Sequence, residues 1–332
     1  MATPLTEPVE LAVDNAGVVL AARDYGGSGS DVLLLPGAER TLLDLDRLAR
    51  IMRDRHRVVT MEVRNHGRSG AGPWTWDAVL SDVRAVCAAV GFSRPVVVGH
   101  SLGGMIAAQY GGIPGATSAV VNLDGVGFGK PEQYVGYSPR KVRLLYAFIE
   151  LLSRPKYRDR AVPPEKLERL RQQKLDYIAS WGHEPEAAAE VFERICQRTA
   201  DGYSTVPTGP QLQALMQSLH SLDMFAIYRS CTSPLLIVNC DDPLPGQMGW
   251  VRDLLGALRK GLRRDYAALI AERPSITVQP MTVEHARMMQ DKPEQIAELI
   301  EDFLAGTTTS LADVGAARST IGGTRTGGAS GS

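Results

Sequence analysis

The sequence has no excess of charge of either sign and no apolar stretch long enough for a membrane helix. Its 36 lysines and arginines stand against 37 aspartates and glutamates, which leaves a net charge of -1. Strong electrostatic attraction to nucleic acid or to an anionic membrane is therefore absent. No apolar run reaches the length that a bilayer requires. We expect neither a nucleic acid nor a membrane as a partner.

Cysteine is scarce, and its few copies lie far apart in the chain. They are Cys87, Cys196, Cys231 and Cys240. They lack the spacing of a metal-ligand set, and three of them sit in apolar or strand-like runs, so we expect buried free thiols in a reducing compartment. Residues 1–11 have neither a basic start nor an apolar core, so we expect no signal peptide and a cytoplasmic protein. No phosphate loop, dinucleotide fingerprint or metal cluster is found, and we expect no cofactor and no metal.

The most informative stretch follows the β-branched run at residues 96–98. Residues 99–103 fit the pattern Gly-x-Ser-x-Gly, and an apolar helical run comes next. In such a turn, side chains at Gly99 and Gly103 would collide with the neighbouring strand and with the turn itself. The helix that begins near Leu102 directs its N-terminal amides at the reacting site, which suits a developing oxyanion. This context predicts Ser101 as a nucleophile.

Apolar runs and turn signals on both sides of this stretch predict alternating strands and helices. Strands are expected at residues 9–13, 18–25, 31–35, 57–63, 96–98, 118–123, 234–239 and 275–279, and helices at 41–54, 75–90, from 102 onward, 247–271 and 291–304. Between residues 126 and 228 only helical patterns are found. Residues 306–332 are dominated by Thr, Ser, Gly, Ala and Arg, and we expect a disordered tail there.

This layout resembles the α/β-hydrolase fold, a mostly parallel sheet with helices on both faces. It is similar to the serine-nucleophile branch with a helical cap inserted after the sixth strand. The resemblance covers about residues 9–304 and includes a loop like Asp-x-Arg-Gly-His-Gly-Arg-Ser at 62–69 and the segment 285–294. It implies a hydrolase core of residues 1–125 and 229–305 with a cap of residues 126–228. A serine in the turn argues against the dehalogenase and epoxide-hydrolase branches, which use a carboxylate nucleophile.

A serine hydroxyl needs a base that takes its proton and an acid that orients this base. In the fold that the chain resembles, the order is serine, acid, histidine. His285 stands just after the last expected strand and is the predicted base. For the acid we favour Asp242, which follows the strand after the cap and precedes a proline, as in the Gly-x-Asp-Pro of similar proteins. Asp124 is the alternative, because some members of the family place the acid after the sixth strand.

The other histidines have weaker claims to the role of base. His100 lies inside the turn, which points it away from the hydroxyl, and His66 packs its own glycine-rich loop. His56 precedes a strand. His183 and His220 belong to the cap and would at most touch a substrate.

An oxyanion hole requires two backbone amides. Leu102, which follows the nucleophile, supplies one, and the loop after the third strand supplies the other. Similar proteins have His-Gly-x in this loop, whereas residues 36–38 read Pro-Gly-Ala, so the amide of Ala38 is the expected second donor. The proline removes a side chain that commonly braces the loop. We expect Glu39 and Arg40 to be a solvated start of the next helix, with contact to a polar substrate as the alternative.

These residues together predict a cofactor-free serine hydrolase. It would cleave an ester, thioester, lactone or amide through an acyl-enzyme on Ser101. Two alternatives stay open, namely an acyltransferase or cyclase with the same triad and a catalytically slow ligand-binding or receptor-like member. The expected partner is a small-molecule substrate that the cap selects, and the sequence specifies no oligomeric state.

Overall fold

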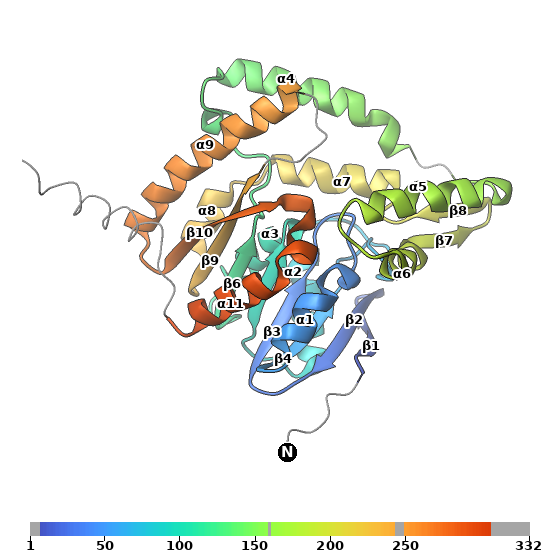
Figure 1. The fold of residues 1–332 in the computed structure, drawn as a ribbon, viewed down its shortest axis with the longest axis horizontal. Helices are drawn as coiled ribbons and strands as arrows, with labels where there is room; N and C mark the ends of the chain where they lie inside the picture. Colours follow the sequence, from blue (N-terminus) through green and yellow to red (C-terminus); the bar gives the residue numbers. More distant parts are fainter. Residues whose placement is uncertain (1–6, 159–160, 243–248, 307–332) are drawn as a thin grey trace, which may run out of the picture.

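The computed structural model describes residues 7–158, 161–242 and 249–306, except for the side chains of residues 241 and 242. Its centre is an eight-stranded sheet with the strand order β1-β2-β4-β3-β5-β6-β9-β10 (Figure 1). These strands are β1 Val9–Asn15, β2 Val18–Gly26, β3 Ser30–Leu35, β4 His56–Met61, β5 Val96–His100, β6 Ala119–Leu123, β9 Leu235–Asp242 and β10 Ile276–Glu284. The pairs β1–β2 and β2–β4 are antiparallel and the remaining pairs are parallel. The expected fold class is confirmed.

Helices cover both faces of the sheet, because its central strands are apolar on both sides. In β3, Val32 and Leu34 pack on one face and Leu33 and Leu35 on the other. The first face is covered by α1 (Asp46–Met52) and α11 (Pro293–Leu304), which lie in front of the sheet in Figure 1. The second face is covered by α2 (Trp76–Val90), α3 (Leu102–Tyr110), α8 (Met224–Ser230) and α9 (Gly249–Glu272). Full burial of each such side chain contributes about 1.5–3 kcal/mol.

Most of the segment between β6 and β9 runs along the side of the molecule opposite the N-terminus (Figure 1). Its helices are η2 Pro131–Gln133, α4 Pro139–Ser153, η3 Arg154–Tyr157, η4 Pro164–Lys166, α5 Leu167–Ala179, α6 Pro185–Ile195, α7 Gly209–His220 and α8. The expectation of helices alone is wrong here, because β7 (Cys196–Thr199) and β8 (Gly202–Thr205) form an antiparallel hairpin. Strands of four mostly polar residues are too short to show an apolar alternation. In the described part of the chain, no helix combines the length and apolarity needed to cross a membrane.

Strand β10 continues five residues beyond its expected end at residue 279. Pro280 cannot donate to a neighbouring strand, but β10 is the last strand of the sheet, where a proline is tolerated. The short helices η5 (His285–Arg287) and α10 (Met288–Asp291) follow at once. The extension therefore delivers His285 directly from the end of a strand.

The carboxyl ends of the parallel strands all meet at one edge of the sheet. Ala38 follows β3 after a short loop, Ser101 follows β5, Asp124 follows β6 and His285 follows β10. Four segments that lie far apart in the sequence thus supply residues to a single edge. The 3-10 helix η1 (Leu42–Leu45) continues from the first of these loops.

Candidate active site

Ser101 occupies a strained position between β5 and α3. Its backbone has φ 54 and ψ -116, a conformation that a residue with a side chain adopts only when its surroundings enforce it. A Cβ atom on Gly99 would lie 2.0 Å from the carbonyl of Gly103, and one on Gly103 would lie 2.1 Å from the Leu35 carbonyl oxygen of β3. The two glycines therefore allow the tight turn, and the collisions expected from the sequence are confirmed.

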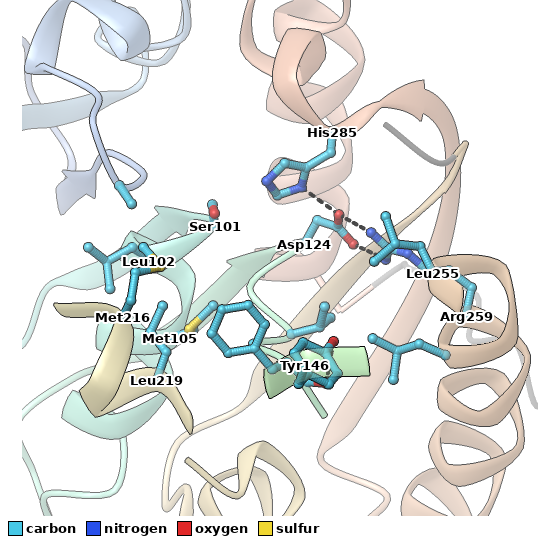
Figure 2. A pocket seen from close by; sticks show the side chains of 15 residues that line it. Ser101, Leu102, Met105, Asp124, Tyr146, Met216, Leu219, Leu255, Arg259 and His285 are labelled. Carbon is cyan, nitrogen blue, oxygen red and sulfur yellow. Dashed lines mark hydrogen bonds and ion pairs between the residues drawn. The ribbon is translucent and has the colours of Figure 1, made fainter. Parts of the chain in front are cut away.

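His285 hydrogen-bonds to Asp124 across the edge of the sheet. Its Nδ1 lies 2.6 Å from Oδ2 of Asp124. The Asp124 side chain is 0% exposed and that of His285 is 23% exposed. Figure 2 shows the second nitrogen of the ring on the side of Ser101, and all three residues line one cavity. A proton on Nδ1 is implied by the carboxylate, and this tautomer leaves the other nitrogen able to accept a proton.

A braced turn after β6 points the Asp124 side chain at His285. Asp124 has φ 55, and the side chain of Asn122 bonds to both the N–H and the carbonyl of Gly125, at 2.7 and 2.9 Å. The hydroxyl of Tyr228 donates to the same carbonyl at 3.0 Å. The turn also packs closely, since a Cβ on Gly125 would lie 2.4 Å from the carbonyl oxygen of Ser101. The backbone around Asp124 is thus held from several sides.

Helix α9 brings a guanidinium to the same carboxylate. Arg259 lies 2.5 Å from Oδ1 of Asp124 through Nη1 and 2.6 Å from Oδ2 through Nη2. Nη1 also donates to Asn239 Oδ1 at 2.8 Å, and the Cys240 amide donates to Asp124 Oδ1 at 3.1 Å. Burial alone would raise the pKa of Asp124, but the charge and hydrogen bonds of Arg259 and His285 lower it well below its usual range. The carboxylate is therefore ionised at ordinary pH.

Arg259 is not predicted as a site residue from the sequence, although the pattern of α9 indicates that this arginine is buried. Leu255, Leu258 and Leu262 form an apolar stripe on α9, and Arg259 lies within that stripe. A charged residue on the buried face of a helix requires a buried partner. That argument predicts an ion pair for Arg259 but does not name its partner.

The described contacts favour the alternative acid over Asp242. The backbone of Asp242 pairs with Glu284 at the end of β9, and its side chain lies outside the described residues. The nitrogen of His285 that an orienting acid would use is bonded to Asp124 instead. The strand end at which the acid was expected supplies Asn239 and Cys240, which hold Arg259 and Asp124.

His100 supports the backbone that carries the base. Its Nε2 lies 3.1 Å from the carbonyl oxygen of His285, and the two ring centroids are 4.8 Å apart. Burial, with a further contribution from the nearby His285, lowers the pKa of His100 to about 3. The ring is therefore neutral at ordinary pH and donates to that carbonyl. His66 is buried as well, with Nδ1 3.0 Å from the Arg64 carbonyl, which confirms its role in packing its own loop.

Two further histidines lie away from the reacting serine. His183 is buried beside Asp44, with Nε2 3.0 Å from Oδ1. The His220 ring stacks on Phe128, with centroids 4.6 Å apart. His183 therefore docks the cap segment on the core. His220 packs on Phe128, which lines the cavity beside Ser101.

The loop with the two expected oxyanion donors lies against the serine. Ala38 and Leu102 line the same cavity as Ser101. A Cβ on Gly37 would lie 3.2 Å from that of Ser101, so the loop approaches the nucleophile closely. The two residues expected to donate to an oxyanion thus lie at the same cavity as Ser101.

Arg40 braces this loop, and its expected exposure to solvent is wrong. It is only 7% exposed. Its guanidinium bonds to Asp44 at 2.9 Å and to the Ala286 carbonyl at 2.8 Å, and lies 3.5 Å from the centroid of the Trp181 ring. A cation can be buried when a carboxylate, a carbonyl and an aromatic face surround it. Arg40 thus links the oxyanion loop to the residue after His285, a bracing that a proline at position 36 cannot provide.

The hydroxyl of Ser101 faces an apolar cavity of about 270 Å³ (Figure 2). Its walls come from α3, which follows Ser101, from α9 and from the segment between β6 and β9. The apolar lining residues are Leu102, Met105, Val126, Phe128, Tyr146, Met216, Leu219, Leu255 and Leu258. Polar groups gather at one end, where Asp124, Arg259 and His285 lie. The site therefore offers a reacting hydroxyl at the polar end of an apolar chamber.

A smaller cavity of about 170 Å³ lies beside the same serine. Ser101, Ala38 and His285 line both cavities, and Arg40, His100, Tyr177 and Trp181 add polar and aromatic walls to the smaller one. A carbonyl group bound at Ser101 would thus have one chamber for each of its two substituents.

Asp124, Cys240 and His285 also bring three potential metal-ligand atoms within 4.8 Å of one another. Both oxygens of Asp124, however, are bonded to the guanidinium of Arg259. A fixed positive charge at this point opposes the binding of a metal cation. The donor set fits an orienting acid better than it fits a metal site.

Solved structures with the same fold carry several hydrolase descriptions. An E-2-(acetamidomethylene)succinate hydrolase has a TM-score of 0.66 at 19% identity and covers 90% of this chain and 100% of its own. The thioesterase domain from the curacin biosynthetic pathway has a TM-score of 0.61 at 17% identity, covering 89% and 100%. A putative epoxide hydrolase from Pseudomonas aeruginosa has a TM-score of 0.59 at 18% identity, covering 92% and 98%. At such identities the likeness establishes the fold alone.

The comparison with curated proteins finds no match. The family model described as "Alpha/beta hydrolase family" matches residues 32–299, which is most of the chain and includes Ser101, Asp124 and His285. Together with the parallel sheet and the structural neighbours, this match shows that the chain belongs to the α/β-hydrolase family.

Proposed function

We propose that the protein is a cofactor-free serine hydrolase that cleaves an ester, thioester, lactone or amide of a small molecule. One observation carries the proposal. Ser101, strained at φ 54, shares a cavity with His285, whose Nδ1 is bonded to the buried and ionised Asp124. A hydroxyl, an imidazole and an orienting carboxylate in this relation are the parts that acyl transfer to serine needs.

Each residue then has a role in the reaction. Ser101 attacks the carbonyl carbon while His285 takes its proton, and Asp124 orients the ring and stabilises the imidazolium. The amides of Ala38 and Leu102 donate to the oxyanion. His285 next protonates the leaving group, and after that it activates the water that releases the acid and restores the serine.

Apolar walls define the class of acyl group that fits. Met105, Leu219 and Leu258 belong to three different helices and enclose the 270 Å³ chamber. At about 30 Å³ for each water-sized group, the chamber holds about nine heavy atoms. We therefore propose an apolar acyl group of up to this size, with the leaving group in the smaller, more polar cavity.

The segment of residues 126–228 acts in this proposal as the cap that selects the substrate. Support comes from Tyr146 of α4 and Met216 of α7, which line the chamber beside Ser101. A reducing, cytoplasmic compartment is part of the proposal because Cys87 and Cys231 are buried free thiols.

Substitution of the nucleophile tests the proposed function. Ser101→Ala should lose at least about a thousandfold in kcat, because the residues of a triad act as a unit. It should also no longer react with a fluorophosphonate probe, and its circular dichroism should stay unchanged. The matched control is Ser118→Ala, which alters an exposed serine just before β6. Undiminished ester hydrolysis by the Ser101 variant would reject the proposal.

Product analysis in the same assays separates hydrolysis from acyl transfer. With a panel of aliphatic and aromatic esters, thioesters and lactones, a hydrolase releases the free acid even when an alcohol or amine acceptor is present. An acyltransferase or cyclase would form the new ester, amide or ring instead. A carboxylate nucleophile is used by epoxide-opening relatives of this fold, so the serine at position 101 favours acyl chemistry over epoxide hydrolysis.

A further inference from the structure

Two cationic or protonatable groups meet at one oxygen of a buried carboxylate. Oδ2 of Asp124 lies 2.6 Å from Nδ1 of His285 and 2.6 Å from Nη2 of Arg259. The two nitrogens are therefore no farther apart than twice that distance, or about 5 Å. Arg259 is 14% exposed on its side chain, so water screens its charge only weakly.

The charge balance of this cluster differs from that of a histidine with an unpaired carboxylate. With a neutral ring, the charges of Asp124 and Arg259 already cancel. A proton on His285 then makes the cluster a net cation, whereas an unpaired carboxylate would be neutralised by that proton. Since like charges at this distance disfavour each other, the guanidinium opposes a second positive charge beside the carboxylate.

We propose that Arg259 is a positioning residue that fixes the carboxylate of Asp124 and extends the working range of His285 to lower pH. The proposal rests on the serine-hydrolase function proposed above. Both oxygens of Asp124 are engaged by the guanidinium fork, which sets the plane of the carboxylate as well as its charge. Asn239 holds Nη1 of Arg259 at 2.8 Å, so the fork itself is fixed from β9.

Other groups around the ring do not supply this effect. Of the residues that the structure describes, the titratable and charged ones that share the smaller cavity or the cluster with the ring are His100, Arg40, Cys240 and Tyr177. His100 is neutral, because burial lowers its pKa to about 3, and the charge of Arg40 is balanced by Asp44 at 2.9 Å. Burial raises the pKa of the Tyr177 phenol. Among the described residues, Arg259 is thus the fixed cation in contact with the acid.

The test is the pH profile of kcat/KM for an activated p-nitrophenyl ester. In Arg259→Gln, the midpoint of the acid limb should move up by about one pH unit or more. Arg259→Lys keeps the charge and loses the fork, so its midpoint should stay near that of the wild type while its plateau falls. The control is Arg264→Gln on the same helix, where the side chain is 60% exposed and paired with Asp265. It should leave the profile unchanged.

The same profile is measured for the rate of fluorophosphonate labelling, which depends on the same base and needs no leaving-group protonation. Arg259→Met carries the same expectation as the glutamine variant and replaces it if that variant does not fold. The proposal would be overturned if a folded Arg259→Gln or Arg259→Met variant showed the same acid-limb midpoint as the wild type and differed only in a lower plateau of kcat/KM. Failure of the serine-hydrolase function would appear differently, as activity that persists in Ser101→Ala.

Discussion

Met216 offers a direct way to alter the size of the chamber beside Ser101. This residue of α7 lines the apolar chamber and also a larger polar cavity of the cap segment, of about 530 Å³. Its side chain is thus a wall between the two spaces. A change of side-chain volume at this position should change the longest acyl chain that the enzyme accepts.

The chamber volume determines how kcat/KM of the wild type should depend on the length of the acyl chain. A space of 270 Å³ holds about nine water-sized groups. Each methylene group that leaves water contributes about 0.8 kcal/mol, and 1.36 kcal/mol corresponds to a tenfold change in rate. For a series of linear esters, kcat/KM should therefore rise up to about fourfold per methylene and level off at about nine heavy atoms.

Two substitutions at one position should move this limit in opposite directions. Met216→Trp adds about six side-chain heavy atoms and should shorten the preferred chain by half or more. Met216→Ala removes about three and should lengthen it by about three carbons. The assay is kcat/KM for p-nitrophenyl esters from acetate to dodecanoate. The control is Leu212→Trp, one turn earlier on α7, which lines the polar cavity and not the apolar chamber.

Two outcomes would refute this reasoning. A flat chain-length profile in the wild type would mean that the acyl group does not occupy the chamber. An optimum that stays the same in both Met216 variants would mean that this side chain does not limit the chain length. In either case the labelling of Ser101 would still report whether the serine is the nucleophile.

Two further predictions concern the acid and the docking of the cap. Asp124→Asn should lower kcat about ten-thousandfold on a simple ester, as the loss of an orienting aspartate does in chymotrypsin. Asp242→Asn should keep near-normal kcat. The reverse pattern would make Asp242 the residue that orients His285. Arg194 of α6 bonds to Glu62 through Nε at 2.8 Å, and both side chains are 0% exposed. Arg194→Met should lower the free energy of unfolding by about 3–5 kcal/mol in urea titrations, because the loss of Arg194 leaves a buried carboxylate without its main partner. The control variant Arg171→Met should change the free energy of unfolding little. A loss below 1 kcal/mol would show that Glu62 is stabilised by other groups.

The fold, the turn around Ser101 and the place of His285 after the last strand could be predicted because local sequence determines them. The turn around Ser101 requires glycine at position 99 because of Gly103 in the same turn, and the pattern Gly-x-Ser-x-Gly also anticipates the close approach of Gly103 to Leu35 of β3. His285 follows the last strand, so its place depends on chain order alone. Each strand in the sheet interior is apolar on both faces and is recognisable as a short run. Apart from the contact of Gly103 with β3, these features need no knowledge of distant contacts.

The contacts of Asp124 could not be predicted in the same way. Asp124 and Asp242 both lie at strand ends on the same edge, and the proline after Asp242 made it the favoured candidate. The contact of Asp124 with Arg259, which lies 135 residues away in the chain, is visible only in the structure. Arg40 shows the same limit, because its burial depends on Trp181 and Ala286 from two distant segments. Charged residues reveal their partners only when the tertiary structure is known.

Backbone strain is concentrated at the edge of the sheet where these residues meet. Glu39, Ser101 and Asp124 have φ of 59, 54 and 55, and they follow the neighbouring strands β3, β5 and β6. Each such conformation costs about 1–3 kcal/mol and persists only when its surroundings enforce it. The Ser101 amide donates to the Leu123 carbonyl at 2.9 Å, and the Asp124 amide donates to the Val238 carbonyl at 2.8 Å. Hydrogen bonds of the sheet thus continue past the strand ends into the strained turns, so the sheet fixes Ser101 and Asp124 relative to each other.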